Sequence, residues 1–253
     1  MKLLNRVTAG VASLMLLGGG ADAQAGWRVL YSAALILTPP QATPQERALI
    51  GRAAALRGGE DCALGERFAA PKLIGRAPGP FLKAGAQETA LVYQTCSIYM
   101  ADTLGLLITR AGKPVLHLAF EGSAISEVYS VLDINRDGLR ELAMLENFGD
   151  AGVGLKWLNV WDFRRVVAGG LPTTPYRFTA ATERCEPGQP GGAAVGSIRQ
   201  YQLWVKPGQT PAFKADERGA DRCSSLRLRP LRQQIPPLKP DFAAPIPTRL
   251  PLP

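Results

Sequence analysis

The sequence predicts an all-β protein, mainly antiparallel and built as a propeller blade or a sandwich, with one short N-terminal α-helix. Short apolar or alternating runs recur from residue 89 onward, and turn signals such as Asp137-Gly138 and Lys206-Pro207-Gly208 separate them. No helical periodicity of comparable length follows residue 60. Strands at this spacing favour an antiparallel β fold over alternating strands and helices.

The expected strands are short runs in which apolar residues either alternate with polar ones or follow one another without a break. They span residues 90–96, 104–109, 115–120, 125–132, 142–145, 155–163, 176–180, 200–206 and 224–228.

The helix is expected at residues 44–57. Thr43-Pro44-Gln45-Glu46 has the form of a capping box with proline at the first helical position. Gly58-Gly59 can end the helix, and its narrow, alanine-rich apolar stripe suits a helix that covers a sheet.

The first 25 residues have the form of a cleaved signal peptide. Lys2 and Arg6 form a positive region before an apolar run at 7–17, and the small-x-small sites Ala21-Asp22-Ala23 and Ala23-Gln24-Ala25 follow that run. This run and a second one at 29–37 are too short to cross a bilayer stably. We therefore expect a secreted or periplasmic protein without an integral membrane span.

Four cysteines, an even number, fit an exported and oxidised protein. They are Cys62, Cys96, Cys185 and Cys223. Pairing neighbours would close two loops, each contributing about 4 kcal/mol in the chain-entropy model. Other pairings remain open, and zinc is disfavoured because no two cysteines are close in sequence.

The expected organisation is a signal peptide (1–25), an N-terminal segment with the helix (26–60), a β domain (61–229) and a proline-rich basic tail (230–253). Proline fixes φ and lacks an amide donor, so polyproline II is the expected conformation of the tail. The net charge is +8, and much of the excess is C-terminal. Six basic residues contribute to it: Arg222, Arg227, Arg229, Arg232, Lys239 and Arg249.

The most informative motif is an acidic loop, DINRDGLRE, between two apolar runs. Its candidate oxygen donors alternate around a glycine at the sixth position: Asp133, Asn135, Asp137, the carbonyl of Leu139, and Glu141. Calcium takes six to eight oxygen ligands, and alternate side chains on a sharply turning loop can supply them. The alternative is a charged turn in which Arg136 and Arg140 neutralise the acids without a metal.

Residues 131–145 resemble the calcium loop of FG-GAP and VCBS-type repeats, the β-hairpins of integrin-like propellers. DINRDGLREL matches their D-x-[DN]-x-D-G-x-x-[DE]-L pattern, although their phenylalanine-glycine and glycine-alanine-proline signatures are missing. Met144 at position twelve excludes an EF-hand. GAQETA at 85–90 aligns with GLRELA at 138–143, which suggests a decayed copy at 81–93. The resemblance implies a β fold and a structural calcium ion, and no activity by itself.

No complete active site is visible. The single histidine, His117, alternates with the apolar residues of its strand and is expected to be structural, and no nucleophile motif is present. Trp157 and Trp161 share one strand face, which suits a buried core pair or, if exposed, a stacking surface.

We therefore expect a non-catalytic interaction or structural module that binds an unidentified protein or an envelope glycan. One alternative is a protein that binds polyanions, either envelope glycans or extracellular nucleic acid, through its basic C-terminal region. A carboxylate glycoside hydrolase is the third possibility, because two acids suffice for that chemistry.

Overall fold

The structure is a computed structural model. It describes residues 26–33, 40–56, 66–98, 101–122, 124–150, 153–186, 195–222, 229–231 and 247–253. The expected signal peptide, the expected strand at 224–228, Cys62 and Cys223 lie outside the described residues.

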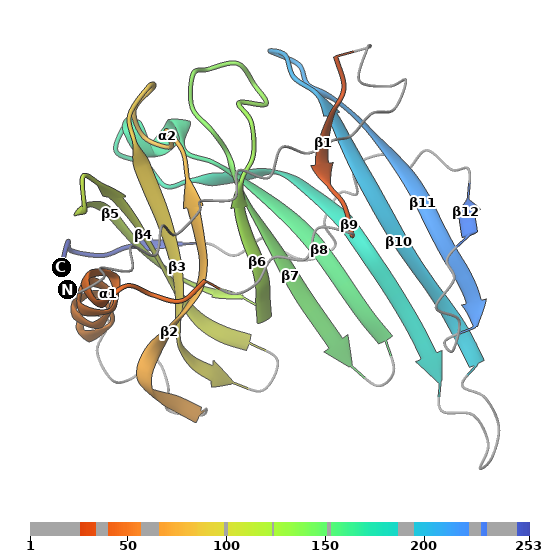
Figure 1. Cartoon of the computed structure of the whole chain (residues 1–253), viewed down its shortest axis with the longest axis horizontal. Helices are drawn as coiled ribbons and strands as arrows, with labels where there is room; N and C mark the ends of the chain where they lie inside the picture. Colours follow the sequence, from red (N-terminus) through yellow and green to blue (C-terminus); the bar gives the residue numbers. More distant parts are fainter. Residues whose placement is uncertain are drawn as a thin grey trace, which may run out of the picture.

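The described residues form two antiparallel sheets, one of which curls into a half-barrel, so the all-β prediction is confirmed (Figure 1). The large sheet has the order β12 (Arg229–Leu231), β11 (Ala212–Arg222), β10 (Val195–Lys206), β9 (Thr173–Glu186), β8 (Val153–Asp162), β7 (Leu142–Asp150) and β6 (Ala124–Ser130), and β1 (Arg28–Tyr31) also pairs with β10. The small sheet has the order β13 (Thr248–Arg249), β5 (Lys113–Gly122), β4 (Ala101–Arg110), β3 (Glu88–Ile98) and β2 (Glu66–Pro78).

Alternation along the strands builds two layers of core. Leu104, Leu106 and Ile108 of β4 are fully buried between the sheets, where they pack with β5, β6 and β7. Leu107 points to the opposite face of β4, into a smaller cluster beneath the helix. Period-two side-chain placement therefore lets one strand bury apolar residues on both faces.

The helix α1 (Pro44–Ala55) covers the outer face of the small sheet (Figure 1). The predicted capping box is present, with the Thr43 side chain accepting from the Glu46 amide and the Glu46 side chain accepting from the Thr43 amide. Leu49, Ile50 and Ala53 are its buried residues. A second helix, α2 (Arg164–Val167), was not predicted, because four residues are too few to show helical periodicity.

The two sheets meet closely where β2 lies against β6. Gly75 of β2 faces Val128 of β6 so tightly that a Cβ atom on the glycine would lie 2.3 Å from the Cβ of the valine. The strand β2 was not predicted, since Pro71 interrupts it and its pairing with β3 has two register shifts.

Part of the proline-rich tail belongs to the folded structure, in contrast to the polyproline II conformation expected for it. Residues 248–249 form β13 at the edge of β5. The ring of His117 is fully buried, with Nε2 lying 2.8 Å from the Tyr93 hydroxyl and Nδ1 lying 2.8 Å from the Pro251 carbonyl oxygen. His117 is therefore structural, as predicted, and fastens the C-terminal segment to the small sheet.

None of the helices in the described ranges is long and apolar enough to cross a membrane.

Candidate functional site

The acidic loop connects β6 to β7 and is held at both ends by backbone hydrogen bonds. The Val131 amide donates to the Glu141 carbonyl oxygen at 3.0 Å, and the Gly208 amide, from the turn between β10 and β11, donates to the Ile134 carbonyl oxygen at 2.9 Å. Arg136 and Gly138 have φ angles of +61° and +87°. The left-handed conformation suits glycine, so Gly138 supplies the sharp turn expected of it.

The first three side chains of the predicted calcium ligands, Asp133, Asn135 and Asp137, lie together and accept hydrogen bonds from the loop's own amides. The Asp137 amide donates to Asp133 Oδ1 and to Asn135 Oδ1, at 3.0 Å each. The Gly138 amide donates to Asp133 Oδ2 at 2.8 Å, and the Leu139 amide donates to Asp137 Oδ1 at 2.9 Å. These bonds curl the chain around its acidic side chains.

Glu141 lies beneath the loop and is only 2% exposed. Its Oε2 accepts a hydrogen bond of 3.0 Å from the Ile134 amide, whereas its Oε1 has no hydrogen-bond partner in the part of the chain that the structure describes. Burial raises the pKa of Glu141 to about 8, the amide hydrogen bonds oppose this shift, and the nearby charges of Asp162 and Asp133 add to it. A buried carboxylate of this kind demands either a proton or a cation.

Two further residues join the site from outside the loop. Asp162, at the end of β8, accepts a hydrogen bond from Asn135 Nδ2 at 3.1 Å. Arg164 of α2 donates from its backbone amide to Asp162 Oδ1 at 2.8 Å, and its side chain forms ion pairs with Asp162 and with Asp137. The sequence does not single out Asp162 as a site residue, because its partners come from another loop and from a helix of four residues.

The arginines within the loop do not neutralise its acids. In the described part of the chain neither Arg136 nor Arg140 forms an ion pair with them, and the Arg140 side chain donates to Ser130 Oγ at 3.4 Å instead. Among the described residues, the guanidinium of Arg164 pairs with Asp137 and Asp162, and neither Asp133 nor Glu141 forms an ion pair with it.

The oxygen donors present suit a hard divalent cation. Carboxylate, amide and backbone carbonyl oxygens are the ligands that calcium prefers, and an unpartnered buried carboxylate oxygen is the group such an ion would neutralise. In the arrangement seen here, no three acidic, histidine or cysteine side chains of the described residues converge as a metal-binding group. The carboxylates of Asp133 and Asp137 point to loop amides instead.

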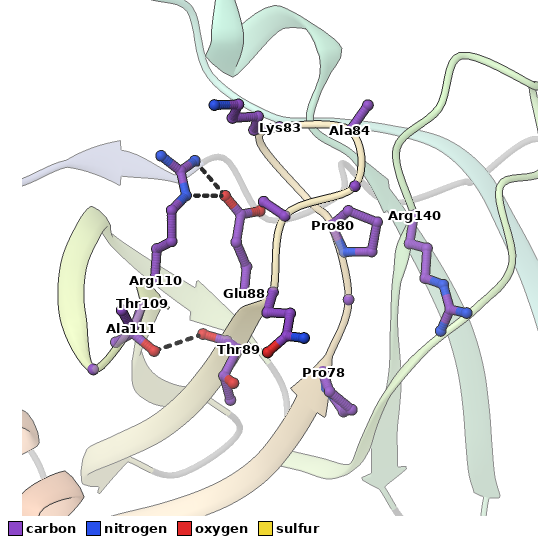
Figure 2. A pocket seen from close by; sticks show the side chains of 15 residues that line it. Pro78, Pro80, Lys83, Ala84, Glu88, Thr89, Thr109, Arg110, Ala111 and Arg140 are labelled. Atoms are coloured by element: carbon purple, nitrogen blue, oxygen red, sulfur yellow. Dashed lines mark hydrogen bonds and ion pairs between the residues drawn. The ribbon is translucent and has the colours of Figure 1, made fainter.

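A cavity of about 870 Å³ lies beside the acidic loop (Figure 2). Its walls come from residues 78–80, the loop 83–87 before β3, the turn between β4 and β5, and Arg140. In Figure 2 the side chains of Arg110 and Glu88 meet on one side of the cavity, and Arg140 lies on the other. Sequence analysis did not find this site, because its walls come from segments far apart in the chain.

The other candidate residues have structural surroundings. Trp161 is 1% exposed and packs against Phe120, with ring centroids 5.0 Å apart. Trp157 is half-buried, and the guanidinium of Arg177 lies 4.3 Å from its ring centroid. Trp161 is thus a core residue and is not available as part of an exposed stacking surface.

Two of the four cysteines can be placed. Cys96 of β3 and Cys185 of β9 lie in the described ranges, where neither is a free thiol. Because Cys62 and Cys223 lie outside those ranges, the pairing of the four remains a prediction.

Fold and site together define an antiparallel β protein with an acidic, partly buried hairpin loop. No family model matches the chain, and no curated protein or solved structure is detectably similar to it.

Proposed function

We propose that this chain is an exported β protein with an interaction or structural role, in which the loop 133–141 binds a calcium ion that fixes the connection between β6 and β7. The ion serves stability and takes no part in a reaction. Asp133, Asn135, Asp137, the Leu139 carbonyl and Glu141 are the proposed ligands.

The observation that carries this proposal is the unpartnered Oε1 of Glu141. An isolated charge costs several kcal/mol when it is removed from water, even after the protein relaxes around it. Asp133 and Asp162 lie close enough to Glu141 to raise its pKa further, so the surrounding charges add to this cost. A divalent cation reverses the sign of these contributions, because every carboxylate then faces a positive charge.

The direct test is thermal unfolding of the oxidised protein in calcium and in EDTA. Extracellular calcium loops bind in the range of about 10⁻⁴ to 10⁻³ M. Calcium at 100 times the Kd stabilises the folded state by about 2.7 kcal/mol. For a chain of this size that gain corresponds to a Tm higher by about 5–10 °C.

Two variants make the test specific. In Asp133→Ala/Asp137→Ala the calcium-dependent rise should disappear, whereas the control Asp216→Ala, which removes an exposed carboxylate on β11, should keep it. A wild-type Tm that is equal in calcium and in EDTA contradicts the proposal, and so does a double variant that responds like the wild type.

A second candidate function is the binding of an anionic partner such as an envelope glycan. The cavity beside the loop favours it, because Lys83, Arg110 and Arg140 contribute to its walls and Glu88 is the one acid among the described residues that line it. Most of the basic tail first considered for this role, including Arg232 and Lys239, lies outside the described residues.

Binding of dextran sulfate at increasing salt tests this second function. Affinity should fall steeply with salt and should weaken in Lys83→Glu, because displaced counterions drive such binding. Binding that is absent at low salt, or equal in the variant, excludes this cavity as the polyanion site.

A further inference from the structure

The loop between β2 and β3 holds a buried glutamate in the same way as the acidic loop does. Glu88 Oε2 accepts from the Phe81 amide at 2.7 Å, and Glu141 Oε2 accepts from the Ile134 amide at 3.0 Å. In each case the donor precedes the glutamate by seven residues. Both glutamates are 2% exposed, and both acceptors sit where a loop enters a strand.

The turns of the two loops also correspond. Gly85 and Gly138, each three residues before the glutamate, have φ angles of +72° and +87°. The loops touch, because the Arg140 amide donates to the Pro80 carbonyl oxygen at 2.8 Å. They therefore form a matched pair within one molecule, with the same backbone device and closely similar burial.

The two loops differ in the residue across the strand pair. In the small sheet Glu88 lies opposite Arg110, whose Nε donates to Glu88 Oε1 at 3.1 Å (Figure 2). In the large sheet Leu142 lies opposite Trp161, and continuing that register by one residue sets Asp162 opposite Glu141. The position that carries a guanidinium in one loop thus carries a carboxylate in the other.

This exchange explains why one carboxylate oxygen is satisfied and the other is not. Glu88 Oε1 accepts two hydrogen bonds from Arg110, whereas Glu141 Oε1 has no hydrogen-bond partner among the described residues and lies within the electrostatic influence of the Asp162 carboxylate. Asp162 already contacts the loop through Asn135 Nδ2, so its carboxylate lies within reach of any ion bound there.

We propose that Asp162 is a further ligand of the cation held by the loop 133–141, and that the guanidinium of Arg110 occupies the corresponding place in the loop before β3. In the loop before β3 the cationic group is a side chain of the protein itself, whereas the loop 133–141 must take a cation from solution. This inference rests on the proposed function, and it adds to it a ligand outside the loop motif and a reason why only one of the two loops needs an ion.

The experiment is calorimetric titration of calcium into the oxidised wild-type protein and three variants. Asp162→Ala removes the proposed ligand and should weaken calcium binding by at least about tenfold, the loss common for groups that support a metal site. Asp216→Ala, which removes an exposed carboxylate on β11, should bind like the wild type. Asp162→Arg should bind no calcium, because a guanidinium then faces Glu141 as Arg110 faces Glu88.

Thermal unfolding of Asp162→Arg gives a readout beyond binding. Its Tm should be equal in calcium and EDTA, and no lower than that of the wild type in EDTA. Wild-type protein that binds no calcium overturns the proposed function itself. Wild-type protein that binds calcium, with Asp162→Ala binding equally tightly or Asp162→Arg still stabilised by calcium, leaves that function intact and overturns the role of Asp162.

Discussion

The contact between Gly75 and Val128 makes the junction of the two sheets a sensitive site for a single methyl group. In Gly75→Ala the new Cβ would lie 2.3 Å from Val128 Cβ and 3.3 Å from Val128 Cα, whereas ordinary contacts begin at 3.4 Å. The atoms met are the first carbon of a β-branched side chain and the backbone itself, so the strands must separate by about 1 Å.

Overpacking of a filled core costs about 1–3 kcal/mol, and this contact belongs at the upper end because no flexible side-chain terminus can move away. A loss of about 3 kcal/mol corresponds to a Tm lower by about 6–12 °C for a chain of this length. Urea unfolding followed by tryptophan fluorescence measures the loss directly.

A matched control comes from the helix. A Cβ on Gly51 of α1 would meet nothing within 4 Å, so Gly51→Ala should stabilise the protein by about 0.5–1 kcal/mol. A second check is the double variant Gly75→Ala/Val128→Gly, in which the clash is relieved and the two losses should not add. Equal stability of Gly75→Ala and the wild type, or strictly additive losses, would refute the tight crossing.

Two further predictions concern the small sheet. Burial favours a raised pKa for Glu46, but hydrogen bonds from Arg76 and Thr43 hold that pKa below its usual value of 4.5. The partly exposed pair should thus contribute about 1 kcal/mol or less at neutral pH. The stability difference between the wild type and Glu46→Gln should shrink as pH falls below 4.5 and vanish once pH passes the lowered pKa of the folded protein, whereas a difference that persists in acid would contradict the ion pair. A Cβ at Gly105 would lie 2.1 Å from Tyr93 Cζ, so Gly105→Ala should cost about 3 kcal/mol in urea unfolding, and a loss under about 1 kcal/mol would show that the Tyr93 ring has room to move.

Sequence patterns predicted the helices and strands that depend on interactions between residues close in sequence. The capping box of α1 was visible because its two reciprocal hydrogen bonds join residues three apart in sequence. The strands β3 and β4 were visible because each alternates between two buried apolar clusters, and β5 was visible because its buried apolar residues recur at every second position. In contrast, β11 was missed because small alanines and polar residues form its sequence, and pairing with β10 rather than its own hydrophobicity makes it a strand.

The same division applies to the acidic loop. Its donors lie within nine residues, so the spacing of Asp133, Asn135 and Asp137 and the need for Gly138 could be predicted from the sequence. Arg136 and Arg140 were equally close in sequence, and neutralisation of the acids by these two arginines was the alternative to a bound metal. The side chain that forms an ion pair with Asp137 of the loop, Arg164, follows the loop by more than twenty residues.

The sequence by itself determined the all-β class and the oxygen-rich character of the loop, because hydrophobic alternation and close spacing act over a few residues. Only the tertiary structure decided which charges face one another. Strand register sets Arg110 opposite Glu88 and brings Asp162 toward Glu141, and register is fixed by the packing of whole sheets. A buried carboxylate therefore acquires its counter-charge, or lacks one, through pairings that no short stretch of sequence contains.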